Sequence, residues 1–275
     1  MNAVLGVDVG GSTTKIVLSD LSNRITDKLQ VQASDQVTSL YGAIGNMLDK
    51  NFLSLRDIKR VVLTGVGADL VQDRLYDIPT FKVNEFRAIG WGGLMLSGLE
   101  RALVVSMGTG TAFVRAQGGQ ATHIGGSGVG GGTLLGLSSK LFGEKDINVI
   151  AALAAQGDLQ NVDLSISDIS TTVIPSLPST ATASNFGKIK STANESDMAL
   201  GLLNMLYQTV GMLAVFACLD HDLKDVVVTG AVASLPQAKS LMGEVGDMYN
   251  LNFIVPDNAT FATAIGATAL YFQAN

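Results

Sequence analysis

The strongest indication of the fold of this chain is the segment Gly6-Val-Asp-Val-Gly-Gly-Ser-Thr-Thr-Lys-Ile-Val17. Apolar residues flank its centre and predict two short strands, over residues 3–9 and 14–19, joined by the tight turn Gly10-Gly11-Ser12-Thr13. Glycine lets the backbone of such a turn come close to a ligand. Successive backbone N–H groups can then surround an anion. The segment therefore predicts a hairpin that binds an anionic group at its turn.

The side chains around this turn are typical of a phosphate site. Ser12 and Thr13 provide hydroxyl donors, and Lys15 provides a cation that can lie on a phosphate. Asp8, at the end of the first strand, can hold Mg²⁺, which prefers carboxylate and phosphate oxygens. An ordinary hairpin turn with a surface lysine would use the same residue types, so this segment alone leaves both interpretations open.

The same pattern occurs again about a hundred residues later. Strands predicted over residues 102–106 and 112–117 enclose the turn Gly108-Thr109-Gly110-Thr111. Two such hairpins can clamp a triphosphate from both sides, which is a more specific signal than either hairpin alone. Neither turn has the pattern G-x-x-x-x-G-K-[ST] or precedes a helix, and this excludes a Walker P-loop.

Predicted strands alternate with predicted helices along the rest of the chain, which is typical of an α/β fold. The repeated hairpin indicates two similar lobes, which we predict to be residues 1–100 and 101–275, with a final helix over 261–272 that can cross back. Ligands of such open sheets bind outside the strand ends where the halves meet. We therefore expect the ligand cleft between the lobes.

Composition excludes several other classes of protein. The 275 residues carry a formal net charge of −6, which argues against a basic surface for nucleic acid, and one cysteine cannot form an internal disulfide. The first residues lack a secretory signal, so we expect a cytoplasmic protein. Residues 198–219 contain no charge and are long enough to span a membrane. A span there would separate parts of one site, so a buried or dimer-interface helix is the preferred interpretation.

Two more glycine segments complete the predicted nucleotide site. Gly125-Gly-Ser-Gly-Val-Gly-Gly-Gly-Thr133 reads as a loop that runs into an apolar helix, whose first N–H groups attract anions. A flexible linker is the alternative, although a linker would not be expected to continue directly into such a helix. The strand over residues 226–229 ends at Gly230, which suits a nucleoside lying flat on the backbone.

In this order, the segments resemble the actin/Hsp70/sugar-kinase superfamily, and within it the type II pantothenate kinase family over nearly the whole chain. The matching segments are Gly6 to Val17, Leu63-Thr-Gly65, Val83-Asn-Glu-Phe86, Gly108-Thr-Gly-Thr111, Gly125 to Thr133, Ala183-Ser-Asn-Phe-Gly187 and Ala264-Ile-Gly-Ala267. The fold that this resemblance implies has two similar lobes with ATP in the cleft between them.

The resemblance implies ATP-dependent phosphorylation of the primary hydroxyl of pantothenate, the first step towards coenzyme A, by a homodimer that holds Mg²⁺-ATP. The long helix would supply much of the dimer contact. Glu85 matches the family's catalytic base, which would accept the hydroxyl proton. Without the resemblance, Glu85 reads as an acid stabilised by the dipole of a helix start.

The predicted site residues follow from the loops and the resemblance together. Lys15 and Glu85 are predicted to be catalytic, and Asp8 to hold Mg²⁺. The predicted ATP contacts are Asp8, Gly10, Gly11, Ser12, Thr13, Lys15, Gly108, Thr109, Gly110, Thr111, Gly130, Gly131, Gly132, Thr133 and Gly230. The predicted substrate contacts are Glu85, Thr109, His123 and Gly125.

Two positions depart from the family pattern, both on the acceptor side. His123 stands where the family has an arginine that contacts the substrate carboxylate, and neutral histidine cannot replace a permanently charged guanidinium. Ala112 stands where the family commonly has a serine. Pantetheine, a sugar or another small alcohol therefore remains an alternative acceptor. A nucleotide-binding regulatory module without acceptor phosphorylation is a further alternative.

Overall fold

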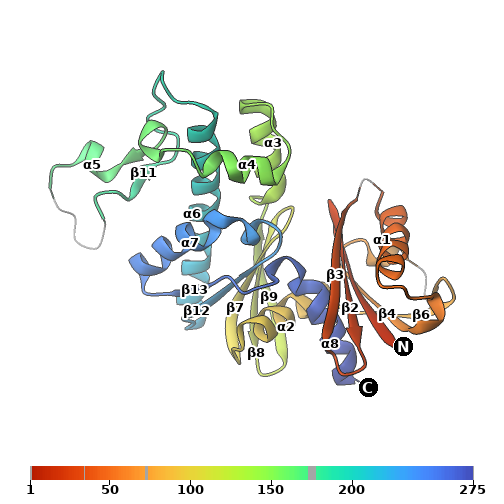
Figure 1. The fold of residues 1–275 in the computed structure, drawn as a ribbon. Coiled ribbons are helices and arrows are strands. Elements are labelled where there is room, and N and C mark those ends of the chain that lie inside the picture. The colour runs from red at the N-terminus through yellow and green to blue at the C-terminus, as the bar shows by residue number, and fades with distance from the viewer. Residues whose placement is uncertain (1, 34, 72–73, 173–177, 275) are drawn as a thin grey trace.

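The computed structural model describes residues 2–33, 35–71, 74–172 and 178–274, which form two lobes, each around a mixed sheet (Figure 1). The sheet of the first lobe has the order β3-β2-β1-β4-β6-β5. Strand β1 pairs antiparallel with β2 and parallel with β4. The strands are β1 (Ala3–Val9), β2 (Thr13–Asp20), β3 (Ile25–Gln32), β4 (Ile58–Thr64), β5 (Arg74–Leu75) and β6 (Ile78–Lys82).

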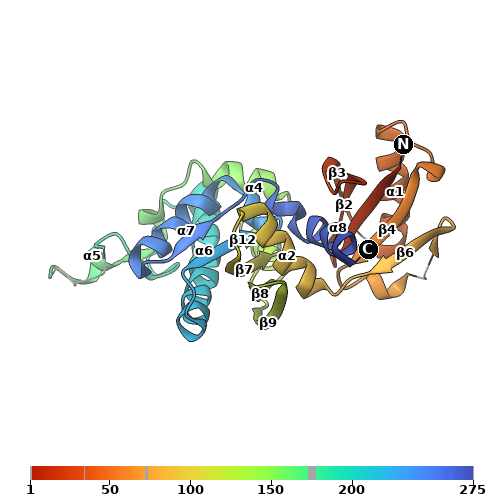
Figure 2. The same cartoon turned by 90° about the horizontal axis from the view of Figure 1, so that it is seen from below.

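The second lobe repeats this arrangement, as the paired hairpins predicted. Its sheet has the order β13-β12-β7-β8-β9, with β7 antiparallel to β8 and parallel to β12. The strands are β7 (Arg101–Met107), β8 (Thr111–Gln117), β9 (Gln120–Ser127), β12 (Asp225–Thr229) and β13 (Asn252–Ile254). A separate two-stranded sheet, β10 (Leu164–Ser165) and β11 (Thr182–Ser184), projects from this lobe (Figures 1 and 2).

Helices cover both sheets. α1 packs on the first sheet, while α3, α4, α6 and α7 form the helical layer of the second lobe (Figure 1). The α-helices are α1 (Gln36–Lys50), α2 (Glu85–Ser97), α3 (Gly131–Leu141), α4 (Ile147–Ala154), α5 (Ile166–Ile169), α6 (Glu195–His221), α7 (Pro236–Tyr249) and α8 (Ala262–Ala274). Short 3-10 helices are η1 (Leu55–Asp57), η2 (Ala68–Leu70), η3 (Leu159–Asn161), η4 (Val232–Ser234) and η5 (Ala259–Phe261).

Helices α2 and α8 lie side by side between the two sheets (Figures 1 and 2). α8 packs on β1, β2 and β4 of the first lobe, whereas α2 packs on β7, β8 and β9 of the second. A lobe boundary near residue 100 stays a prediction, and α2 already packs against the second sheet although it precedes that boundary. The two helices can approach closely because Gly92 and Gly266 have no Cβ. A Cβ on either glycine would collide with the backbone of the other helix.

Helix α6 runs through the second lobe. Among the residues that the structure describes, it is the one helix long and apolar enough to cross a membrane, and 56% of that apolar window is buried inside the protein. A core helix of a soluble protein meets the same criteria. Tyr207 is fully buried on this helix and donates its hydroxyl to the backbone oxygen of Val232 at 2.7 Å.

Two local predictions were wrong in part. Residues 125–127 were expected in a loop but belong to β9, whose pairing with β8 holds Gly125 opposite Phe113. The polar stretch over residues 158–182 was expected to be mostly loop, yet its described part contains η3, β10 and α5, ending where β11 begins. In both stretches, hydrogen bonds to neighbouring elements stabilise a regular structure that the local sequence favours only weakly.

Candidate active site

The first hairpin carries a buried charge pair at the mouth between the lobes. Asp8 is the last residue but one of β1 and pairs across the strands with Lys15 of β2, and Lys15 Nζ lies 3.5 Å from Asp8 Oδ2. Both side chains are about nine-tenths buried. Burial raises the pKa of Asp8, and the charge of Lys15 opposes this rise. A buried carboxylate beside one cation is a site that favours further positive charge.

The two hairpin turns meet across the lobes. In the first turn, Gly10 N–H donates to Thr13 O at 3.1 Å, and in the second, Gly108 N–H donates to Gly110 O at 2.8 Å. The hydroxyl oxygens of Ser12 and Thr109, which are 97 residues apart in the chain, lie 2.8 Å from each other. Both side chains are exposed. The structure thus brings the two predicted phosphate loops together.

The glycine run supports the second hairpin. Gly131 N–H donates to Gly108 O at 2.8 Å, and Gly132 N–H donates to Thr109 O at 2.9 Å. These N–H groups at the start of α3 were expected to face a phosphate, and in this structure they are bonded to the hairpin. The Thr133 hydroxyl is occupied as well, because it accepts from Gly130 N–H and donates to Gly128 O. The run therefore shapes the hairpin.

Two more predicted ATP contacts have structural roles in the same region. The Thr111 hydroxyl is buried and donates to Val129 O at 2.8 Å, so it is not free for a nucleotide. Gly230 follows β12 with a φ of +94°, and a Cβ there would collide with the backbone oxygen of Met107. Only glycine suits this position, where the turn passes directly beside the end of β7.

Glu85 begins α2, directly after the N-cap residue Asn84, whose side chain accepts from Arg87 N–H at 3.1 Å. Burial and the negative charge of Asp8 raise the pKa of Glu85, while Lys15 lowers it. Glu85 is thus within electrostatic reach of the Asp8–Lys15 pair. A half-buried carboxylate with a raised pKa suits a general base, because its proton affinity is increased.

Three of the four residues predicted to contact the acceptor lie on α2 and β9. The His123 ring stacks on the Phe86 ring, with 4.0 Å between centroids and 13° between planes. His123 is exposed and lies on a strand, next to the residue that follows Glu85. Gly125 is two residues farther along β9, and Ala112 lies on β8 opposite Gly126. The structure therefore brings His123 to the start of α2, whereas Thr109 lies in the turn between β7 and β8.

The residues around Asp8 fit a magnesium ion that is also bound by phosphates. Mg²⁺ keeps several waters and is usually held by one or two carboxylates plus substrate phosphates. Asp8 supplies one carboxylate, and the buried Thr64 hydroxyl on the neighbouring strand has no hydrogen-bond partner. The described part of the chain contains no group of three or more His, Cys, Asp and Glu side chains that could hold a metal ion.

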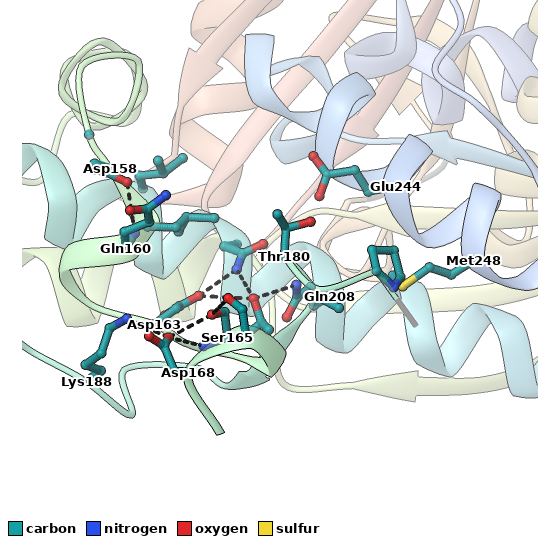
Figure 3. A pocket seen from close by; sticks show the side chains of 18 of the residues that line it. Asp158, Gln160, Asp163, Ser165, Asp168, Thr180, Lys188, Gln208, Glu244 and Met248 are labelled. Carbon is teal, nitrogen blue, oxygen red and sulfur yellow. Dashed lines mark hydrogen bonds and ion pairs between the residues drawn. The ribbon is translucent and has the colours of Figure 1, made fainter. Parts of the chain in front are cut away.

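A large cavity of about 1060 Å³ lies elsewhere, between the β10–β11 hairpin, α6 and α7 (Figure 3). The buried Asp163 accepts there from Phe186 N–H at 2.8 Å and from Asn204 Nδ2 at 2.7 Å, and Asp168 pairs with Lys188. No predicted site residue lines this cavity. Its size alone does not make it the catalytic site, because both predicted phosphate hairpins and the buried charge pair lie outside it.

Comparison with known proteins agrees with this arrangement. The sequence model of the family described as Fumble matches residues 101–245, more than half of the chain. A type II pantothenate kinase of Staphylococcus epidermidis is 28% identical over 97% of this chain and 99% of its own length. A type II pantothenate kinase of Bacillus thuringiensis subsp. konkukian is 26% identical over 84% of this chain and 83% of its own.

Several solved structures have a similar fold. The activator of the 2-hydroxyisocaproyl-CoA dehydratase from Clostridium difficile, solved with bound ADPNP, has a TM-score of 0.71 at 18% identity, covering 99% of this chain and 95% of its own. The ROK hexokinase from Thermus thermophilus has a TM-score of 0.59 at 16% identity, covering 99% and 100%. These neighbours confirm the predicted α/β fold of the actin/Hsp70/sugar-kinase type. The chain belongs to the Fumble family.

Proposed function

We propose that this protein is a type II pantothenate kinase, which uses ATP to phosphorylate the primary hydroxyl of pantothenate in the cytoplasm. The observation that carries this proposal is the position of Glu85, a carboxylate with raised pKa beside the Asp8–Lys15 pair. The alignment with type II pantothenate kinases over 97% of the chain supports the same acceptor.

The reaction follows from the positions of these groups. The two hairpins hold the triphosphate, and Lys15 offsets its negative charge. The acceptor oxygen forms a bond to the γ-phosphorus, the bond from that phosphorus to the bridging oxygen breaks, and ADP leaves. Glu85 accepts the proton of the acceptor hydroxyl. Mg²⁺ would be held by Asp8 and would neutralise charge on the phosphates. Catalysis of phosphoryl transfer rests mainly on such positioning and charge neutralisation.

The proposal is tested by measuring ADP release from Mg²⁺-ATP with pantothenate, with pantetheine and without an acceptor. Turnover that pantothenate stimulates supports the kinase. Stimulation by pantetheine alone would assign the protein to an acceptor without a carboxylate. Nucleotide binding without stimulation by either compound would contradict the proposal and favour a regulatory module, for which the absence of the family's arginine is the motivating observation.

Replacing His123 by arginine is expected to lower the KM for pantothenate by a factor of about 10 to 100, the effect of one hydrogen bond to a charged group. Arginine can stack on Phe86 as His123 does, and it adds a permanent charge for the acceptor carboxylate. Steady-state kinetics with pantothenate and pantetheine measure this effect. The KM for pantetheine, which lacks the carboxylate, should stay unchanged, and an equal change for both acceptors would contradict a carboxylate contact.

We further propose that the protein is a homodimer that pairs through α6. Leu213, Phe216 and Leu219 of this helix are 39%, 61% and 73% exposed, and they lie three residues apart on one apolar face. Large apolar side chains that gather on one helical face commonly mark an interaction surface. We do not propose nucleic acid as a partner, because the net charge of −6 argues against a basic binding surface.

Replacing Phe216 by aspartate is expected to convert the dimer to a monomer, because two charges would face each other across a dry contact. Analytical ultracentrifugation measures the mass in solution. Phe52→Asp is a matched control, since Phe52 is 99% exposed in the other lobe and should leave the mass unchanged. A Phe216→Asp variant that sediments as the parent protein does would exclude this face of α6 from the interface.

A further inference from the structure

Thr64, the last residue of β4, has a buried hydroxyl without a partner. Its side chain is fully inaccessible, and Thr64 Oγ1 makes no hydrogen bond. Buried polar groups are nearly always bonded, because an unpaired one is costly in free energy. A valine would fill the same volume without that cost. A threonine hydroxyl at such a position therefore suggests a partner that binds together with a ligand.

The position of Thr64 identifies the ligand. In the parallel pair of β1 and β4, Thr64 lies opposite Asp8, and Asp8 lies opposite Lys15 on β2. The three side chains form a row on the face of the sheet that carries α8, because Val4 and Val62 of the same alternation pack there against Ala267. The unpaired hydroxyl is thus next to the carboxylate that fits the metal.

The turn after Thr64 is shaped around the same carboxylate. Gly65 has a φ of +89°, and a Cβ on it would lie 2.6 Å from Asp8 Oδ1. Glu85 is also close enough for its pKa to be raised by the charge of Asp8. Two carboxylates and one hydroxyl therefore lie near one another beside the Lys15 ammonium, and their oxygen atoms suit a hydrated cation.

An unpaired hydroxyl alone would not establish this role. Thr14 of β2 is equally buried and unpaired, but it lies on the opposite face of the sheet, in the apolar layer with Ile16 and Leu18 under α1. No ligand is expected there. The position of Thr64 beside Asp8 distinguishes the two threonines, and Thr14 provides a control on the same sheet.

We propose that Thr64 is a positioning residue for the metal of the bound nucleotide. Its hydroxyl accepts a hydrogen bond from a water in the hydration shell of the Mg²⁺ that Asp8 holds. A magnesium ion keeps most of its waters in proteins, so groups that bind these waters fix its place. This inference rests on the proposed kinase function, because it requires a metal-nucleotide complex between the hairpins.

The test compares ADP binding by calorimetry in excess Mg²⁺ and in EDTA. In Mg²⁺, Thr64→Val is expected to bind ADP about 10-fold to 100-fold more weakly, the usual effect of losing a group that orients a metal ligand. Thr64→Ser, which keeps the hydroxyl, and Thr14→Val should bind as the parent protein does. In EDTA, all four proteins should bind ADP equally. Thermal unfolding checks that each variant is folded, and Thr64→Ala replaces the valine variant if that variant does not fold.

Three outcomes would overturn the proposal. The first is parent-like affinity of Thr64→Val in Mg²⁺, and the second is a loss of affinity that is as large in EDTA. A parent protein whose ADP affinity does not depend on Mg²⁺ would also overturn it. Failure of the proposed function looks different: the parent protein would bind Mg²⁺-ADP, and the Thr64 variants would behave as expected, while pantothenate would not stimulate turnover.

Discussion

Replacing Glu85 by glutamine is expected to lower the kcat for pantothenate phosphorylation by a factor of about 10² to 10⁴, the contribution of a positioned general base. Glutamine keeps the size of the side chain and its place at the start of α2, but it cannot accept the hydroxyl proton. The affinity for ADP should remain, because the hairpins proposed to hold the phosphates are not changed. Single-turnover kinetics and calorimetry separate these two quantities.

The matched control is Glu195→Gln. Glu195 is also an acid in the first turn of a helix, α6, where it is exposed to solvent. If Glu85 served only to stabilise the start of α2 through the helix dipole, the two variants would have similar small effects on stability and none on kcat. A Glu85→Gln variant that keeps the parent kcat within a few-fold would therefore rule out its role as the base.

The pH profile gives an independent readout for the same variant. Burial and Asp8 raise the pKa of Glu85 above its ordinary value of 4.5, so kcat/KM should fall towards acid pH already above that value. Glutamine does not titrate, so the residual rate should lose this acid limb. The folded state binds the Glu85 proton more tightly than the unfolded state does, so ionised Glu85 destabilises the fold as pH rises through the raised pKa. Glu85→Gln should consequently raise the melting temperature at pH 7.

The hairpins were predictable from the sequence because their signals are local. Glycines at Gly10 and Gly108 lie between two apolar runs each, and pairing such runs through a short turn needs no information from elsewhere in the chain. The contact between Ser12 and Thr109 could not be predicted in this way. Its two residues were each predicted to bind phosphate, but their 2.8 Å separation depends on how the lobes pack.

The glycine run shows why the rest of the site could not be predicted. Glycine pairs such as Gly125-Gly126 have low strand propensity, so the last three residues of β9 were predicted as a loop, and their pairing with β8 compensates for that propensity. The bonds from Gly131 and Gly132 to the second hairpin join residues more than twenty positions apart. Thr64 lies in a segment that matches the family, but only its register with Asp8 shows that it lies opposite that carboxylate.

Replacing Gly266 by alanine is expected to destabilise the protein by about 1–3 kcal/mol, the usual cost of inserting a methyl group into a packed interior. A Cβ on Gly266 would collide with the backbone oxygen of Ala88 and lie 2.6 Å from Gly92 N. Backbone atoms in the middle of a helix cannot move aside as a side chain can. Chemical denaturation measures the free energy of unfolding, with Gly45→Ala as the control.

The control should change stability in the opposite direction. Gly45 lies inside α1, and a Cβ added to it would have no atom within 4 Å apart from its chain neighbours and the nearby backbone of its own helix. Alanine there should therefore stabilise the protein by about 0.5–1 kcal/mol through helix propensity. Equal effects of the two substitutions would contradict a close contact at Gly266.

The contact at Gly266 also bears on catalysis, because α2 begins with Glu85 and α8 packs on β1, which ends near Asp8. Displacing α2 from α8 would move Glu85, the proposed base, away from the hairpins proposed to hold the phosphates. Gly266→Ala should therefore lower kcat more than it weakens ADP binding at temperatures where the variant is folded. Single-turnover kinetics and calorimetry measure the two effects. An unchanged kcat would show that the contact at Gly266 contributes to stability and not to catalysis.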